Sequence, residues 1–361
     1  MYVTPIGLDI GGRWIKAVQL RRAGPHSSRL RVHAAVRFQR SGDNIGPTLS
    51  REEVVRAADV LARHAFSGRA VVIPLPAPAQ FSCPIRLPAR DSGAPLDQIA
   101  LSQLADHARL GPEAMVGAWW EAPTGGTPKE TSGFALGGRR KDVESMLDAF
   151  AGSGLDPIAV DARPCALVRA CAPMLTAGTS ALSATIDIGS ASGTLSVAHA
   201  GRLVYERTLP EFGTSAVRQM LADELEVEPD VADYLLSRIG LGPPPPDCPP
   251  DSAKVIEDAQ ELMGQHFSGM ARELQTSLSY AAGAAGADPQ GAVFLVGGGA
   301  LTPGLAERIG AEMQCPARSI SLDDLALVPG HVTPDARSCS MVVAAGLALN
   351  DARAVALEVA A

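Results

Sequence analysis

Short apolar runs that end at polar turns alternate with stretches of helical period along most of the chain. Residues 6–20 hold two apolar runs around an Asp-Ile-Gly-Gly turn, which predicts a hairpin of two strands with an acid at its tip. Ser50 and Glu53 form a capping-box pattern ahead of apolar residues at helical spacing, so we expect a helix over residues 51–66. The β-branched run at residues 70–75 favours a buried strand.

The pattern changes over residues 78–138, where prolines are frequent. The periodicity there predicts one helix at residues 96–110 and three strands at residues 81–87, 115–121 and 132–136. We interpret this stretch as a small subdomain inserted into the first half of the chain. That half then resumes with a helix, a strand and a helix, at residues 142–150, 157–160 and 164–174.

The opening pattern returns in the second part of the chain. An apolar run ends at Asp187 and Gly189, and further apolar residues lead to a turn at Gly201, so the sequence predicts a second acid-tipped hairpin. Further helices are expected over residues 215–225, over a long stretch after a proline cluster, and over residues 340–349.

A glycine triplet follows the last strongly apolar run. Residues 292–296 lead into Gly297, Gly298 and Gly299, and a helix is expected from about Pro303. Strand, glycine turn and helix in this order are typical of phosphate- and nucleotide-binding loops. We therefore predict an α/β fold of two related halves. Residues 1–77 and 139–180 would form the first half, residues 78–138 the inserted subdomain, and residues 181–361 the second half.

Length, composition and charge narrow the class of protein. A chain of 361 residues exceeds the usual size of a single core, so two or more domains are expected. Hydrophobic residues at 46% and charged residues at 19% are typical of a globular chain. The net charge of -8 argues against a nucleic-acid partner, because binding to phosphate backbones requires a basic face. The cysteines and histidines have no metal-ligand spacing.

The sequence gives no sign of a targeting or membrane segment. No signal-peptide pattern opens the chain, and no uncharged apolar run reaches the roughly 18 residues that a spanning helix needs. Residues 350–361 do not have the pattern of a membrane-surface helix. We therefore expect a cytoplasmic protein that reaches a membrane only through a partner.

Two aspartates carry the candidate chemistry. Asp9 and Asp187 each lie where an apolar strand meets a glycine turn, at matching places in the two halves. A single such aspartate is equally well explained as an acceptor of turn amides. Two related copies would meet at one cleft between the halves, where they could hold Mg²⁺ through water while turn amides bind phosphates. Asp9 and Asp187 are therefore the predicted metal residues.

The residues around the two aspartates suit a nucleotide. The turn glycines allow the backbone to approach a ligand, hydroxyls follow the second turn, and a lysine follows the first; these residues are Gly11, Gly12, Gly189, Ser190, Ser192, Thr194 and Lys16. Lys16 is explained equally well as a solvated strand lysine. Adenosine is expected against the Gly297–Gly299 backbone, so ATP or ADP with Mg²⁺ is the predicted ligand.

Several segments carry a family resemblance. They are residues 6–20, residues 185–189 with Gly201-Arg202, and residues 295–305, supported by residues 154–161, 272–280 and 344–349. On these segments the chain resembles the actin-like ATPases, a family that includes actin, Hsp70, sugar kinases, FtsA and the pilus assembly proteins of the PilM type. The resemblance is strongest to the PilM type and spans nearly the whole chain. It implies two phosphate loops and an adenosine loop.

The resemblance also implies a role and a partner. An ATP-binding scaffold at the cytoplasmic face of the inner membrane is expected to dock the N-terminal cytoplasmic tail of a single-span pilus membrane protein of the PilN type. The segment at residues 272–280 adds Glu273 as a cofactor contact. Arg13 stands in a loop that is usually made of small or hydroxyl residues, where it either contacts phosphate or caps the turn.

Other functions stay open at this stage. No dedicated catalytic base stands out, so the protein is expected to be at most a slow ATPase. A small-molecule kinase of the same fold is the main alternative, and the cytoplasmic module of a type II secretion platform is a further one. A division protein of the FtsA type is less consistent with the C-terminal sequence. Self-association is left open.

Overall fold

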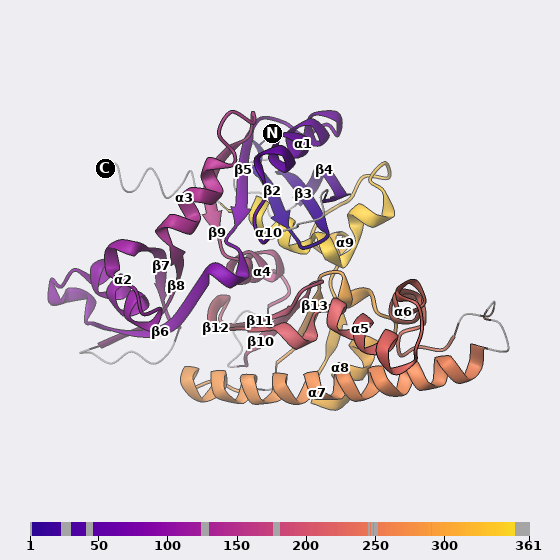
Figure 1. Cartoon of the computed structure of the whole chain (residues 1–361). Coiled ribbons are helices and arrows are strands. Elements are labelled where there is room, and N and C mark those ends of the chain that lie inside the picture. The colour runs from indigo at the N-terminus through magenta and orange to yellow at the C-terminus, as the bar shows by residue number, and fades with distance from the viewer. Residues whose placement is uncertain are drawn as a thin grey trace.

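Three β-sheets organise the described residues, one in each predicted half and one in the predicted subdomain (Figure 1). The computed structural model describes residues 2–22, 30–40, 46–123, 130–175, 181–244, 246, 248, 252–289 and 291–350. Residues 351–361 lie outside this set, so the expectation for the C-terminal end is not tested. Within the described ranges, no helix is both long enough and apolar enough to cross a membrane.

The first sheet has six strands in the order β1-β3-β2-β5-β9, with β4 also paired to β3. Its strands are β1 (Tyr2–Val3), β2 (Ile6–Ile10), β3 (Trp14–Arg22), β4 (Leu30–Gln39), β5 (Ala70–Pro74) and β9 (Asp156–Asp161). β2 and β3 are antiparallel, whereas β2, β5 and β9 run parallel. The predicted opening hairpin is confirmed. Helices α1 (Arg51–Arg63), α3 (Arg140–Asp148), α4 (Arg163–Cys171) and α10 (Val342–Ala348) accompany this sheet.

The second sheet repeats this arrangement. Its order is β12-β11-β10-β13-β14, formed by β10 (Ser183–Ile188), β11 (Gly193–His199), β12 (Arg202–Leu209), β13 (Val293–Val296) and β14 (Ala317–Ser319). An antiparallel hairpin is again followed by parallel strands. The register is also repeated, because Asp9 pairs with Lys16 in the first hairpin and Asp187 pairs with Thr194 in the second.

The helices after β12 are α5 (Thr214–Glu224), α6 (Pro229–Tyr234) with a π-helical continuation at Leu235–Ile239, α7 (Ala253–Ala285), α8 (Leu305–Met313) and α9 (Leu322–Leu325). Of these, α9 packs on the first sheet, because Leu322 shares a core cluster with Val18 and Val32. Helix α7 runs beneath the second sheet, on the side away from the first half (Figure 1). Its apolar face carries Met263, Phe267 and Leu274 into the largest core cluster.

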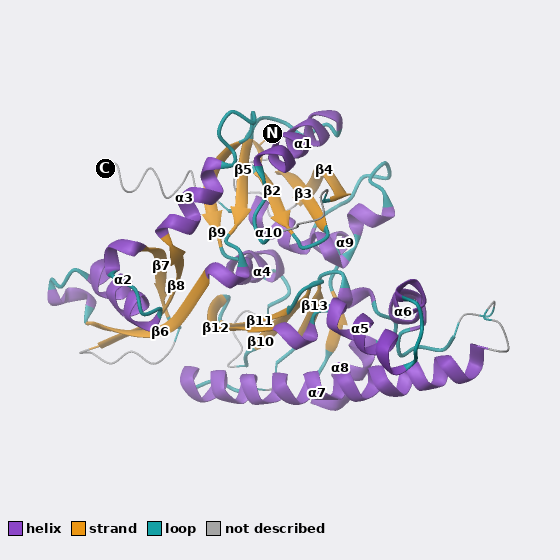
Figure 2. Ribbon diagram, viewed as in Figure 1, coloured by secondary structure: helices purple, strands orange, loops and turns teal. Residues whose placement is uncertain are grey.

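The inserted subdomain is a three-stranded sheet with one helix. Strands β6 (Gln80–Pro88), β8 (Glu130–Arg139) and β7 (Met115–Glu121) are adjacent in that order, and α2 (Leu96–His107) covers one face (Figure 2). The predicted strands and helix of this stretch are confirmed. The subdomain has its own core. Its first and last residues meet, because Gln80 pairs with Gly138 across the β6–β8 ladder.

Two helices join the halves. Helix α4 contacts β11 and β12 of the second half, and α10 contacts α4, β2 and β3. Gly7 allows α10 to lie directly on β2, since a Cβ at Gly7 would stand 1.9 Å from the Ala344 carbonyl oxygen. The last helix in the sequence thus packs on the first sheet, and the chain order does not separate two independent packing units.

The subdomain also contacts the second half directly. The Trp120 indole donates to the Leu203 carbonyl at 2.6 Å, and the Ser82 hydroxyl donates to the Glu206 carboxylate at 2.7 Å. Leu203 and Glu206 both lie on β12, the edge strand of the second sheet. These contacts tie the subdomain to both halves.

Candidate functional site

Asp9 is fully buried and lies between two cations. The Lys16 ammonium donates to Asp9 Oδ2 at 2.7 Å, and the Arg163 guanidinium pairs with Oδ1. Arg163 also donates to the carbonyl oxygen of Ile10. Burial alone would raise the pKa of the Asp9 carboxyl, but Arg163 and Lys16 outweigh burial and hold it below the usual range. The Asp9 carboxylate is therefore ionised, and each of its oxygens is already paired with a cation.

The first predicted phosphate loop, residues 11–13, is held by a buried arginine. Arg40 pairs with Glu53 at 2.8 Å and donates to the Gly11 carbonyl at 3.3 Å, and its backbone amide donates to Arg13. Glu53 completes the predicted capping box with Ser50, so one carboxylate serves both the helix start and the loop. A Cβ at Gly12 would meet no atom within 4 Å, and Gly12 and Arg13 are exposed.

Asp187 has the opposite surroundings. It is partly buried, and among the described residues its carboxylate has no hydrogen bond or ion pair. Burial raises the pKa of its carboxyl, and the charge of Asp9 adds to this, while Arg163 and Lys16 oppose the rise. Its cross-strand partner Thr194 is uncharged. Asp187 is thus close enough to Asp9, Arg163 and Lys16 to be influenced by their charges.

The second predicted phosphate loop lies against the start of α5. The amides of Thr214 and Ser215 donate to the carbonyls of Gly189 and Ser190 at 2.9 Å, and Gly189 donates to the Ser192 carbonyl at 3.0 Å. The turn is thus fixed by backbone groups. Side chains extend the network: the Ser190 and Ser215 hydroxyls are 2.9 Å apart, and Arg218 donates to Ser215 at 3.0 Å and pairs with Asp233 at 2.8 Å.

The three glycines of the third loop have different roles. Gly297 has φ +85°, and a Cβ there would stand 2.3 Å from Asp187 Oδ1. A Cβ at Gly299 would stand 2.2 Å from Ile188. Gly298 has φ −67° and ψ −34°, which any residue adopts, and a Cβ there would meet nothing within 4 Å. The dihedral angles at Gly298 therefore do not require glycine, and only the space in front of Gly298 remains as a reason for glycine.

One predicted cofactor contact lies elsewhere. Glu273 is on α7, where it pairs with Arg207 of β12 at 2.9 Å. Helix α7 covers the far side of the second sheet (Figure 1), and among the described residues the ion-pair partner of Glu273 is Arg207 rather than a residue of the loops. Its role as a cofactor contact stays a prediction.

The donor set fits a divalent cation on one side of the space only. Asp187 offers a carboxylate without a partner among the described residues, beside hydroxyls of the second loop. Asp9 has both oxygens occupied by cations and no exposed surface. Within the described ranges, no group of three or more His, Cys, Asp or Glu side chains could hold a metal by itself. A Mg²⁺ ion here would depend on Asp187, water and ligand phosphates.

Sequence reasoning missed several residues of this region. Arg163 contacts Asp9, Arg40 contacts Gly11 and Arg218 contacts Ser190, and each arginine is distant in sequence from that residue. The only signal for Arg163 was an arginine beside a proline at a predicted helix start, which is an unfavourable place for a cation. Leu301, just after the glycine triplet, is 47% exposed and adds apolar surface beside Gly298.

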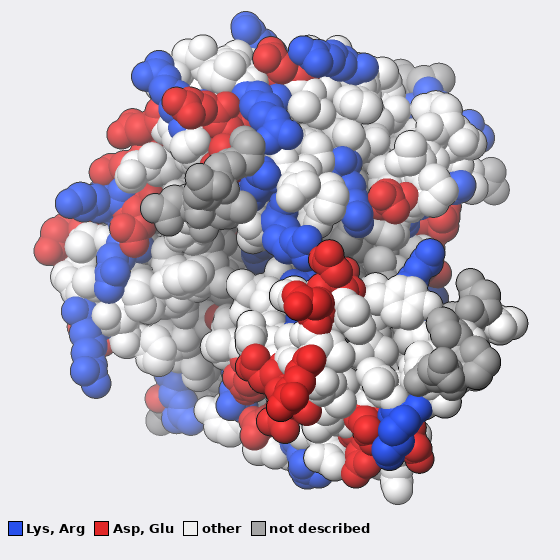
Figure 3. All heavy atoms as spheres, turned by 45° about the vertical axis from the view of Figure 1, so that its right-hand side comes forward, with Lys and Arg blue, Asp and Glu red and all other residues white. Residues whose placement is uncertain are grey.

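Charge is divided across the boundary between the halves. Figure 3 shows Lys and Arg side chains along the upper side of this boundary and Asp and Glu side chains on the lower side. Lys16 and Arg163 contribute positive charge from the first half, and Asp187 contributes negative charge from the second. The two sides of the candidate site therefore carry complementary charge.

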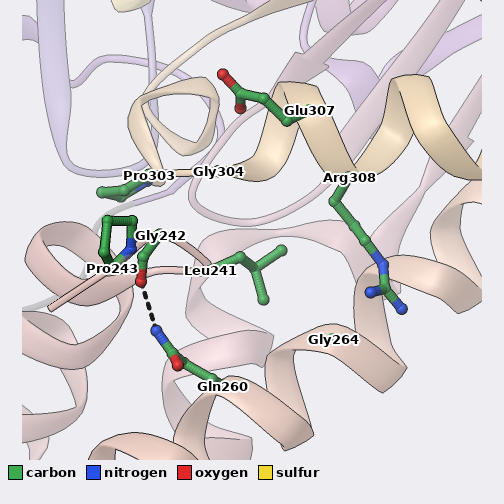
Figure 4. Close-up of a pocket in the computed structure, with 9 residues that line it drawn as sticks. All are labelled: Leu241, Gly242, Pro243, Gln260, Gly264, Pro303, Gly304, Glu307 and Arg308. Carbon is green, nitrogen blue, oxygen red and sulfur yellow. Dashed lines mark hydrogen bonds between the residues drawn. The ribbon is translucent and has the colours of Figure 1, made fainter.

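A cavity of about 680 Å³ lies away from the aspartates. It is bordered by α7, the start of α8 and the loop before α7, and Gln260 crosses its floor to donate to the Gly242 carbonyl at 2.6 Å (Figure 4). A second cavity of about 590 Å³ shares Gln260, Gly264 and Arg308 with it. The first cavity includes Pro303 and Gly304 from the end of the third segment, but no residue of the two hairpins lines either cavity. The candidate site is therefore defined by the hairpins.

Comparison with known proteins agrees with this geometry. A family model described as "Type IV pilus assembly protein PilM" matches residues 7–352. A solved PilM-PilN type IV pilus biogenesis complex is similar with a TM-score of 0.75 and 18% identity, covering 96% of this chain and 98% of that chain. No curated protein matches the chain by sequence.

Two further solved structures share the fold. MreB5 of Spiroplasma citri bound to ADP has a TM-score of 0.53 and 11% identity, covering 98% of both chains. The ethanolamine utilization protein EutJ from Carboxydothermus hydrogenoformans has a TM-score of 0.53 and 14% identity, covering 97% of this chain and 90% of that chain. The predicted actin-like α/β fold is confirmed.

Proposed function

The chain belongs to the PilM family of type IV pilus assembly proteins, and we propose that it is a nucleotide-binding scaffold that docks the cytoplasmic tail of a membrane partner. The site of action would be the cytoplasmic face of the inner membrane, reached through that partner. The similarity to the PilM-PilN complex over nearly the full length of both chains supports this proposal most strongly. The chain would work by holding partners rather than by rapid turnover.

The proposed ligand is ATP or ADP with Mg²⁺. Support comes from the similar structure of MreB5, which was solved with ADP bound. Phosphates would meet the two turns through Gly11, Gly12, Gly189 and the hydroxyls of Ser190 and Ser192, and adenosine would lie at Gly298. Mg²⁺, when bound, would neutralise phosphate charge from the side of Asp187. Arg13 remains a proposed contact of the first turn.

Nucleotide binding is tested on the two aspartates. We expect Asp187→Ala to weaken binding of Mg²⁺-ATP by about tenfold, because Asp187 is the carboxylate that a hydrated ion can reach. Asp9→Ala should weaken it less, since Asp9 is covered by Lys16 and Arg163. Calorimetric titration measures both affinities, with circular dichroism as the control for folding. Wild-type affinity in the Asp187 variant would remove this residue from the site.

The proposed partner is the N-terminal cytoplasmic tail of a single-span protein of the PilN type. The expected docking place is the junction of the inserted subdomain with the first half, where β6 and β8 meet α3. A tail that becomes ordered on binding loses conformational entropy, so moderate affinity is expected. The PilM-PilN complex supplies the class of partner, and the groove residues are left to experiment.

Replacing residues 78–138 by a short linker tests this docking place. The replacement is geometrically feasible, because Gln80 and Gly138 are paired neighbours at the base of the subdomain. We expect loss of binding of a fluorescent tail peptide, measured by anisotropy, with nucleotide binding retained. Equal binding by both chains would exclude the subdomain as the docking site.

A matched control separates docking from domain coupling. The double variant Ser82→Ala, Trp120→Phe removes two hydrogen bonds to β12 and leaves the one from Arg202 to the Glu121 carbonyl, while keeping an aromatic ring against Phe134. This variant should bind the tail peptide as wild type does. If it loses binding as fully as the replacement does, the contact with β12 rather than the subdomain surface is responsible.

A further inference from the structure

Arg163 is an unusual residue at the centre of the candidate site. It is the first residue of α4, where the positive end of the helix dipole disfavours a cation. The ion pair with Asp9 and the hydrogen bond to the Ile10 carbonyl offset this cost and fix the guanidinium in place. Its side chain is 16% exposed, so Arg163 is accessible to solvent although its partner Asp9 is not.

Arg163 and Lys16 together cover the carboxylate that was expected to hold a metal. Asp9 has a side-chain exposure of 0%, whereas Lys16 is 15% exposed. The two cations therefore have surface that a ligand can contact, whereas the carboxylate between them has none. Two cations and one carboxylate leave this side of the site with a net positive charge.

The other side of the site is different. Asp187 interacts electrostatically with Arg163 and Lys16, but they make no ion pair with it. Its neighbour Thr194 cannot supply charge. A divalent cation is thus attracted by the Asp187 carboxylate and is repelled beside Asp9, where Lys16 and Arg163 already pair with the carboxylate.

We propose that Arg163 takes the place of a metal ion at Asp9, so that nucleotide phosphates bind to a guanidinium and an ammonium on the first half and to Mg²⁺ only beside Asp187. This inference rests on the proposed nucleotide site and states its charge arrangement. Arginine suits the task because its planar group binds carboxylate and phosphate oxygens at the same time. Nucleotide binding then depends only in part on Mg²⁺.

The test compares the affinity for ATP with Mg²⁺ and with EDTA, by calorimetry on the full chain. For the wild type we expect about a tenfold loss in EDTA, from the Asp187 side alone. In Mg²⁺, the ATP affinity of Arg163→Gln should remain within about threefold of wild type, because the ion can then reach Asp9. On transfer to EDTA, this variant should lose at least about fivefold more ATP affinity than the wild type does. Arg163→Lys keeps the charge, so its loss of ATP affinity in EDTA should lie between those of the wild type and Arg163→Gln.

Arg169→Gln is the matched control. Arg169 lies on the same helix and pairs with Asp161 and the Gly346 carbonyl, so its loss also breaks an arginine-carboxylate pair on α4. For Arg169→Gln, the ratio of the ATP affinity in Mg²⁺ to that in EDTA should stay at the wild-type value. Circular dichroism and thermal unfolding verify that each variant is folded.

Tripolyphosphate in EDTA separates the phosphate subsite from the nucleotide site. We expect the wild-type chain to bind tripolyphosphate in EDTA, and Arg163→Gln to bind it at least about tenfold more weakly. If tripolyphosphate binds through Arg163 but ATP binds no more tightly, the adenosine part of the proposed function falls and this inference stands. An unchanged Mg²⁺-to-EDTA ratio in folded Arg163→Gln overturns the inference while ATP binding itself stands. A wild-type chain that binds neither ligand overturns both.

Discussion

The two acid-tipped hairpins have the same register and opposite electrostatics. Asp9 and Asp187 occupy matching places, each paired across its hairpin with one residue, Lys16 or Thr194. The lysine, with Arg163, neutralises Asp9, whereas Asp187 keeps a carboxylate with a raised pKa. A repeated backbone therefore gives a repeated position but not a repeated function, because the cross-strand neighbour decides the charge.

The loops beside the hairpins differ in the same way. The first loop is held by the guanidinium of Arg40 and its pair with Glu53, whereas the second is held by backbone amides at the start of α5. The first half thus relies on ionised side chains and the second on main-chain hydrogen bonds. The two loops should respond differently to mutation and to pH.

The largest expected difference is in stability. Asp9→Ala leaves Lys16 and Arg163 without their buried partner, so we expect the free energy of unfolding to fall by about 3 kcal/mol. Asp187→Ala removes a carboxylate that burial disfavours, and should raise the same quantity by up to about 1 kcal/mol. Urea unfolding without nucleotide, followed by circular dichroism, measures both. Equal losses would show that the hairpins are electrostatically alike.

A smaller contrast is expected between two open glycines, Gly298 in the third loop and Gly12 in the first. Neither would bring a Cβ within 4 Å of another atom, so valine at either position should leave the fold intact. We expect Gly298→Val to weaken ATP binding by about tenfold, because the side chain fills the space proposed for adenosine. Gly12→Val should cost about threefold or less, since Gly12 lies in the loop that departs from the family pattern.

Calorimetry of both valine variants, with thermal unfolding as the folding control, gives the result. Unchanged affinity in Gly298→Val would mean that the triplet is only a structural turn. Gly299→Val serves as the opposite control, because its Cβ would stand 2.2 Å from Ile188 and should destabilise the fold itself.

The smallest expected effect is a dependence on pH. The hydrogen bonds from Arg40 hold the pKa of Glu53 below its usual range, although burial opposes them. Because the folded pKa is lowered, this stabilisation is complete above the unfolded pKa of about 4.3 and is lost as pH falls through the folded value. We expect the stability that Glu53 adds over Glu53→Gln to shrink by on the order of 1 kcal/mol on acidification to pH 3.

Comparison of unfolding free energies at pH 7 and pH 3 provides the measurement. Ser215→Ala, in the second loop, is the control and should lose equal stability at both values, since the amides that hold this loop do not titrate. A constant difference between wild type and Glu53→Gln would contradict the assignment of Arg40 and Glu53 as the anchor of the first loop.

The fold was predictable from sequence where the determining contacts are local. The hairpin at Asp9 and the capping box of Ser50 and Glu53 depend on residues a few positions apart, and both are present as expected. The strand β4 was missed, since its alternation of buried and exposed residues depends on β3 beside it.

The candidate site was predictable only in outline. The glycines and aspartates were visible because their spacing repeats, but Arg163 reaches Asp9 from a distant part of the chain. No periodicity encodes such a pair. The division of the chain into halves and a subdomain remains a prediction.

The position of α10 has a consequence for synthesis on the ribosome. This helix comes from residues 342–348, yet it packs on β2 and β3, which are made first. Val18 and Leu20 of the first sheet therefore stay exposed, or are bound by a chaperone, until almost the whole chain has emerged, because they pack against Ala344 and Ala345 of this helix. The second sheet is complete once β14 has been synthesised, because no later strand joins it. The half translated first is thus the half completed last, and its earliest strands are the segment most in need of protection from aggregation.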